Sequence, residues 1–148
     1  MQSDLKRESH DILLNKMHDI QETYGFIPEG EINKLAKEFD MPRAKLYGVI
    51  RFYSMFYTEA TGKYVIRICD SLSCHINQSE GVLNSVKDYL GIENGETTEN
   101  KMFTLEVVEC LGHCGEGPVM MVNNEVYTHV DKSKALEILN KCVWKEAK

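Results

Sequence analysis

The chain has 148 residues, of which 43% are hydrophobic and 27% are charged. This composition is typical of a soluble globular protein, and the length allows one domain or a small domain with a helical extension. A net charge of −6 argues against a nucleic-acid partner, because phosphate backbones are bound by clustered Lys and Arg. No stretch approaches the roughly 18 apolar residues of a membrane span, and the charged N-terminus does not resemble a signal peptide. We therefore expect a cytoplasmic protein without direct membrane insertion.

Apolar residues follow helical spacing from residue 5 to about residue 57. Gly25 stands where a first helix would end, Pro28 can begin a second, and Pro42 precedes a third. The three apolar stripes are Leu13, Met17, Ile20 and Tyr24; Ile32, Leu35, Ala36 and Phe39; and Leu46, Val49, Ile50 and Tyr53. The pattern predicts a small helical bundle over residues 1–60.

The periodicity changes after Gly62. Residues 64–68 and 103–108 are predicted strands, and residues 82–90 between them have helical spacing that ends at Gly91. Residues 119–122 and 125–128 flank Asn123-Asn124, which favours a β-hairpin. Asp131 can cap a last helix, whose inward residues are expected to be Ala135, Leu136, Leu139 and Val143. The predicted order from residue 61 onward is β-α-β-β-β-α.

Four of the five cysteines form two closely spaced pairs. Cys69 and Cys74 follow the first predicted strand, whereas Cys110 and Cys114 follow the second. Both pairs lie in loops rich in Gly or Ser, where small residues let backbone N–H groups approach a sulfur ligand. Two such loops side by side would supply the four thiolates that a [2Fe–2S] cluster needs. The glycines expected to present amides to the sulfurs are Gly112, Gly115 and Gly117.

Spacing alone leaves other uses of these residues open. A structural zinc site can also be built from four cysteines, although closer pairs are usual. A redox disulfide between Cys110 and Cys114 would leave the first pair unexplained. His75 and His113 suggest a Rieske-like centre, which is disfavoured because four cysteines already complete the ligand shell. Cys142 has no partner in the sequence and is expected to be a buried free thiol.

Read together, Cys69-x4-Cys74, the segment CLGHCG from Cys110 and the segment GPV from Gly117 resemble one known family. It is the thioredoxin-like [2Fe–2S] component of respiratory complex I, often called its 24-kDa or E subunit. Equivalent subunits occur in electron-bifurcating [FeFe] hydrogenases and NAD-dependent formate dehydrogenases. Residues 24–28 and 49–56 are similar to the helical segment of that family, so the resemblance covers about residues 10 to 142. Gly117 stands where the family commonly has Ala, and Gln78 where Gly is common.

The resemblance implies an α+β protein in which the helical bundle of residues 1–60 precedes a thioredoxin-like α/β domain with a mixed sheet, residues 61–148. It implies that one [2Fe–2S] cluster is bound by Cys69, Cys74, Cys110 and Cys114. It also implies an electron-transfer subunit of an NAD(P)H-linked oxidoreductase. The expected partner is a flavoprotein subunit that binds FMN and NAD(P)H, with a hydrogenase, formate dehydrogenase or other catalytic subunit beyond it.

No complete active site is expected in this chain itself, since it has neither a G-x-G-x-x-G fingerprint nor a P-loop. A cluster that holds one electron cannot take up a hydride, so the two-electron step must occur on a flavin elsewhere. Two other functions compete: a free-standing [2Fe–2S] ferredoxin shuttle and a zinc-stabilised interaction module. Aromatic residues near residue 55 are expected either to fill the seam between the two halves or to form a partner interface; they are Phe52, Tyr53, Phe56 and Tyr57.

Overall fold

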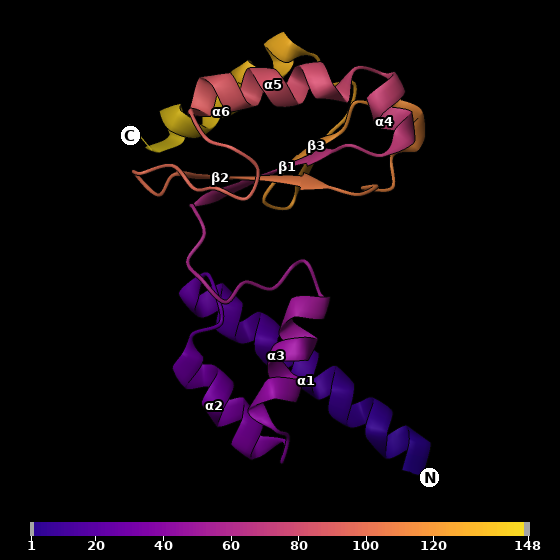
Figure 1. The fold of residues 1–148 in the computed structure, drawn as a ribbon, viewed down its shortest axis with the longest axis vertical. Coiled ribbons are helices and arrows are strands. Elements are labelled where there is room, and N and C mark those ends of the chain that lie inside the picture. The colour runs from indigo at the N-terminus through magenta and orange to yellow at the C-terminus, as the bar shows by residue number, and fades with distance from the viewer. Residues whose placement is uncertain (1, 147–148) are drawn as a thin grey trace. The chain divides into compact units, whose positions relative to one another are not determined.

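The computed structural model describes residues 2–146, drawn as a ribbon in Figure 1. The chain divides into two compact units, residues 1–60 and residues 61–148. Among the described residues, no helix combines the length and the apolar character that a bilayer crossing requires.

The first unit consists of α1 (Gln2–Tyr24), α2 (Glu29–Glu38) and α3 (Arg43–Phe52). Gly25 ends α1 with a φ of +78°, a conformation that glycine adopts at no steric cost. The predicted apolar stripes supply most of the core, which comprises Leu13, Met17, Ile27, Ile32, Leu35, Leu46, Ile50 and Phe56. Tyr24 is an exception at 53% exposed, and it lies in the last turn of α1.

The aromatic residues near residue 55 do not share one role. Phe56 is 6% exposed and belongs to the core of the helical unit, where its ring lies 4.8 Å from that of His18. The backbone of Tyr57 accepts a 2.7 Å hydrogen bond from Ile27 and so ties the end of the unit to the start of α2. Phe52 is 80% exposed and stays a candidate for a partner interface.

The second unit is built on a mixed sheet of four strands in the order β2-β1-β3-β4. The strands are β1 (Tyr64–Cys69), β2 (Phe103–Val108), β3 (Met120–Val122) and β4 (Glu125–Tyr127). β1 pairs with β2 in parallel, in a register that sets Cys69 beside Val108, and with β3 antiparallel. Because β1 and β2 run in the same direction, the chain leaves both of them at the same edge of the sheet.

Helices α5 (Ser79–Leu90) and α6 (Lys132–Glu146) cover one face of this sheet (Figure 1). Ile66 and Ile68 of β1, Leu105 of β2 and Met120 of β3 are fully buried in the core of this unit.

The predicted caps and turns of the second unit are confirmed. Gly91 ends α5 with a φ of +66°, and Asn123 of the hairpin turn has a φ of +52°. The Asp131 carboxylate accepts a 2.7 Å hydrogen bond from the Lys134 N–H and so caps α6. On α6 the prediction for Val143 is wrong. Its side chain is 36% exposed, and Ile138 and Cys142 face the core instead.

Among the glycines of the second unit, Gly62 lies closest to another part of the backbone. A Cβ on this residue would lie 2.6 Å from the carbonyl carbon of Phe103, where no real Cβ fits. Its N–H also donates a 2.6 Å hydrogen bond to the buried hydroxyl of Thr104. We expect Gly62→Ala to lower the free energy of unfolding by about 1–3 kcal/mol, the usual cost of overpacking. Chemical denaturation would measure the loss, with Gly30→Ala, where a Cβ meets nothing within 4 Å, as the control.

Candidate metal centre

The two cysteine pairs lie at the sheet edge where β1 and β2 end. Cys69 is the last residue of β1, and Cys110 follows the end of β2 by two residues. Backbone hydrogen bonds continue past the strands, because Cys69 N–H donates to the Val119 carbonyl at 3.1 Å and Asp70 N–H donates to the Val108 carbonyl at 3.0 Å. These hydrogen bonds hold the segment that carries Cys69 beside the segment that leads to Cys110, although the two are far apart in the sequence.

The first pair is buried. Cys69 and Cys74 are 1% and 2% exposed and pack with Val119 and Leu111. Cys74 does not lie in a loop, as the sequence predicts, but on the short helix α4 (Leu72–Ile76). A helix of this length offers barely one turn, so apolar periodicity could not indicate it.

The second pair is exposed. The sulfurs of Cys110 and Cys114 lie 3.1 Å apart, and Cys114 begins the 3-10 turn η1 (Cys114–Glu116). The Ser73 hydroxyl on α4 donates a 2.6 Å hydrogen bond to the Cys114 carbonyl, which holds η1 against α4. Two thiolates on one tetrahedral metal with bonds of about 2.3 Å lie about 3.8 Å apart. A modest opening of this pair would accommodate a metal.

The thiols of the two pairs influence one another's pKa values. Burial alone raises the pKa of Cys69, but the N–H of Ser71, the Cys74 thiol and the N–H of Leu111 outweigh it, so that this pKa lies below the usual value. The pKa of Cys74 is raised by burial and then by its contact with Cys69, and Cys114 adds to that effect. The pKa of Cys114 is raised first by Cys110 and further by Cys69. Ionisation of Cys69 therefore opposes that of Cys74 and of Cys114.

Backbone amides reach several of these sulfurs, as a polyanionic ligand set requires. Gly112 N–H donates to the Cys110 sulfur at 3.3 Å, as expected from the sequence. The backbone N–H groups of Ser71 and Leu111 donate to the Cys69 sulfur, and that of Val119 donates to the Cys74 sulfur. The sequence does not reveal these three residues, because every residue type except proline has a backbone N–H and only the fold determines where that N–H points.

Gly117 lies directly beside the buried Cys74 sulfur. A Cβ at this position would lie 3.3 Å from the Cys74 sulfur and 3.4 Å from the Cys74 Cα. Its backbone, with a φ of −65°, would accept alanine, so the constraint is space beside the sulfur and not conformation. The glycine leaves room around a buried thiol.

The two histidines beside the cysteines contact carboxylates. His75 Nδ1 lies 3.2 Å from Asp70 Oδ1, and His113 Nδ1 lies 3.2 Å from Glu116 Oε2. Both imidazoles are exposed, at 54% and 43% of the side chain. The Asp70 carboxylate also accepts a 3.1 Å hydrogen bond from the Ser79 hydroxyl at the start of α5.

The donor set fits a [2Fe–2S] core. Such a core takes two thiolates on each iron, and this edge of the sheet presents two cysteine pairs with amides directed at the sulfurs. As the side chains stand within residues 2–146, no three His, Cys, Asp or Glu side chains are arranged to hold a metal ion. Cys69, Cys74, Cys110 and Cys114 are the candidate ligands because they are the thiols that lie at this edge.

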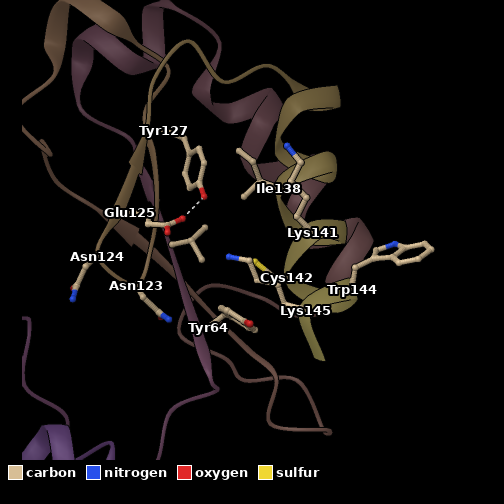
Figure 2. A pocket seen from close by; sticks show the side chains of 11 residues that line it. Tyr64, Asn123, Asn124, Glu125, Tyr127, Ile138, Lys141, Cys142, Trp144 and Lys145 are labelled. Carbon is tan, nitrogen blue, oxygen red and sulfur yellow. Dashed lines mark hydrogen bonds between the residues drawn. The ribbon is translucent and has the colours of Figure 1, made fainter. Parts of the chain in front are cut away.

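Cys142 lies apart from this edge, on α6. Its thiol is 6% exposed and belongs to the sheet–helix core, and burial raises its pKa. Figure 2 shows it in the wall of a groove of about 600 Å³ between α6 and the β3–β4 hairpin. On the hairpin side, the Tyr127 hydroxyl donates a 2.6 Å hydrogen bond to Glu125, which raises the pKa of Tyr127 to about 12. None of the four candidate ligands lines this groove.

A mixed sheet with helices on one face, and cysteine pairs where two parallel strands end, is the arrangement of a thioredoxin-like protein with candidate thiolate ligands. Residues 2–143 match the thioredoxin-like [2Fe–2S] ferredoxin family, and the chain belongs to that family. The resemblance seen in the sequence is thus confirmed.

Relatives and solved structures agree with this assignment. The chain is 38% identical over 125 residues to the E subunit of NADH-quinone oxidoreductase from Aquifex aeolicus (strain VF5), a match that covers 84% of this chain and 78% of that protein. It is 35% identical over 122 residues to the protein of the same name from Escherichia coli (strain K12), covering 82% and 74%. An air-oxidised NAD+-reducing [NiFe]-hydrogenase shares the fold, with a TM-score of 0.79 at 18% identity over 90% of this chain. That match spans 23% of the hydrogenase chain.

Proposed function

We propose that this chain binds one [2Fe–2S] cluster through Cys69, Cys74, Cys110 and Cys114 and relays single electrons within an NAD(P)H-linked oxidoreductase. The observation that carries the proposal is the convergence of two cysteine pairs at one sheet edge, with backbone amides directed at their sulfurs. When bound, the cluster supplies one-electron transfer, since it holds one electron at a time.

The residues of the chain provide what such a cluster needs from a protein. Cys69 and Cys74 would hold one iron in a buried position, and Cys110 and Cys114 the other at the surface. Amides of Ser71, Leu111, Gly112 and Val119 offset the negative charge of the thiolates, which makes reduction more accessible. The arrangement gives the inner iron protection from solvent and the outer iron access to a partner.

The electron donor is an FMN-containing subunit that oxidises NADH or NADPH. NADH delivers a hydride, and a flavin can divide that pair into single electrons. The names of the relatives support this assignment, because NADH-quinone oxidoreductase and NAD+-reducing hydrogenase both join a nicotinamide nucleotide to a second redox reaction. The electron would leave this chain for the catalytic subunit of a complex I-like enzyme, a hydrogenase or a formate dehydrogenase.

Anaerobic purification followed by iron and acid-labile sulfide assays tests the cofactor. We expect iron and sulfide in equal amounts and a paramagnetic signal after reduction with dithionite. Stoichiometric zinc in a colourless preparation would overturn the assignment in favour of the zinc-stabilised module.

A second measurement tests the electron donor. The holoprotein is mixed with the FMN-containing, NAD(P)H-oxidising flavoprotein of the same genome, and bleaching of the cluster is followed after addition of NADH or NADPH. We expect bleaching only when the flavoprotein is present and co-elution of the two chains on size exclusion. Cluster reduction without any stable association would favour the free-standing ferredoxin.

A further inference from the structure

Helix α4 carries a candidate ligand on one side and two large exposed apolar residues on the other. Leu72 is 76% exposed and Ile76 is 71% exposed. They are four residues apart and therefore share one face of the helix. Cys74, midway between them, points the opposite way and is 2% exposed. The apolar face lies about one helix diameter, roughly 10 Å, from the cysteine sulfur.

Single exposed apolar residues are ordinary on protein surfaces, but this pair has a particular setting. The exposed Cys110 and Cys114 lie at the same edge, since Ser73 of α4 is hydrogen-bonded to the Cys114 carbonyl. Figure 1 shows α4 at one end of the second unit and the C-terminal end of α6 at the other. The apolar pair is thus on the part of the unit where electrons would enter and leave.

Acidic residues outnumber basic residues in the segments that carry the cysteines. Residues 68–86 and 102–131, which contain all four candidate ligands, have no Lys or Arg. Asp70, Glu109 and Glu116 lie beside the cysteines in the sequence and are exposed. Lys132 lies outside those segments in the sequence but lines a hollow together with Asn77 and Gly117. The exposed carboxylates still outnumber this lysine, so basic residues on a partner would complement the surface around the apolar pair.

We propose that Leu72 and Ile76 form the centre of the surface on which the FMN-containing subunit docks, with Asp70, Glu109 and Glu116 as its acidic rim. The inference rests on the proposed function, because it names the place where that partner binds. Electron transfer slows steeply with distance, so the productive complex must cover the sheet edge that holds the cysteines. Electron-transfer complexes commonly bury small interfaces, for which two apolar anchors and a charged rim are sufficient.

A double variant with a matched control tests the docking surface. Leu72→Gln with Ile76→Gln removes the apolar centre and keeps side chains that suit a helix. Trp144→Gln, 73% exposed near the end of α6, removes a comparable exposed apolar side chain at the opposite end of the unit. The readout is the rate of NAD(P)H-driven cluster bleaching by the flavoprotein as a function of holoprotein concentration.

We expect the double variant to raise the apparent KM for the holoprotein by about 10- to 100-fold, with an unchanged visible spectrum and dithionite signal. The Trp144 variant should stay within about twofold of the unsubstituted protein. Raising the ionic strength from about 0.05 to about 0.5 M should raise the KM of the unsubstituted protein, since salt screens the acidic rim. These outcomes together would support the proposal that the flavoprotein docks on Leu72 and Ile76.

The outcomes also separate the two proposals. Normal bleaching of the unsubstituted protein with an unchanged KM in the double variant would overturn the docking surface and leave the proposed function intact. An effect of Trp144→Gln alone would overturn it too, because the partner would then bind at the far end of the unit. Failure of the flavoprotein to bleach even the unsubstituted cluster would overturn both proposals.

Discussion

Replacement of Cys69 by alanine is expected to leave a folded chain without its cluster. Cys69 is 1% exposed, and backbone amides of Ser71 and Leu111 are directed at its sulfur. At this buried position, water could not take the place of the missing sulfur ligand as easily as it could at the surface. Loss of an outer-shell partner already lowers metal affinity by about 10- to 100-fold, and loss of a direct ligand should exceed that range. Visible absorbance and iron content of anaerobically prepared protein would measure the effect.

Cys114→Ala should also lose the cluster, although its thiol is exposed. It is one of the pair whose sulfurs lie 3.1 Å apart, and the fifth cysteine is buried in a different core. Cys142→Ala is the matched control, because that thiol lies in the core beneath α6, and it should retain colour and iron. Bleaching in the Cys142 variant, or full colour in either of the other two, would contradict the ligand assignment.

The strands that position this site could be predicted from the sequence because their composition is local. Residues 103–108 alternate and residues 64–68 are β-branched and aromatic, so the predicted bounds agree with β2 and β1 to within a residue. The turn at Asn123 and the cap at Asp131 followed from single residue types with known backbone preferences. The cysteines then fell at strand ends without further assumption.

Other parts of the site depend on the fold and could not be predicted. The helix α4 is too short to show apolar periodicity in the sequence. Ser71, which precedes it, acts through its backbone N–H, and the residue type does not reveal that role. Cys69 and Cys74 are buried because they pack against Val119. The other two candidate ligands, Cys110 and Cys114, are exposed. The space beside Gly117 similarly depends on where α4 places the Cys74 sulfur. Spacing in the sequence therefore predicts which thiols act as ligands, but not how each is shielded from solvent.

Removal of the cluster is expected to destabilise the second unit without abolishing its fold. The core between the sheet and helices α5 and α6 contains none of the four candidate ligands, so the sheet should persist in the apoprotein. The α4–η1 edge would lose the link between its two cysteine pairs and keep the Ser73–Cys114 hydrogen bond. A cluster present at about a thousand times its dissociation constant stabilises the native state by about 4 kcal/mol.

Thermal unfolding of holoprotein and chelator-treated apoprotein, followed by circular dichroism, would measure this difference. Hydrogen exchange would locate it, because amides of α4 and of β3 should exchange faster in the apoprotein than in the holoprotein. Amides of α2 provide an internal control, since Ile32 and Leu35 are buried in a core that the helical unit supplies from its own residues. A cluster bound by four thiolates would join α4 to the end of β2 and would stabilise both segments. Equal unfolding midpoints and equal exchange rates of the α4 amides in holoprotein and apoprotein would contradict this arrangement.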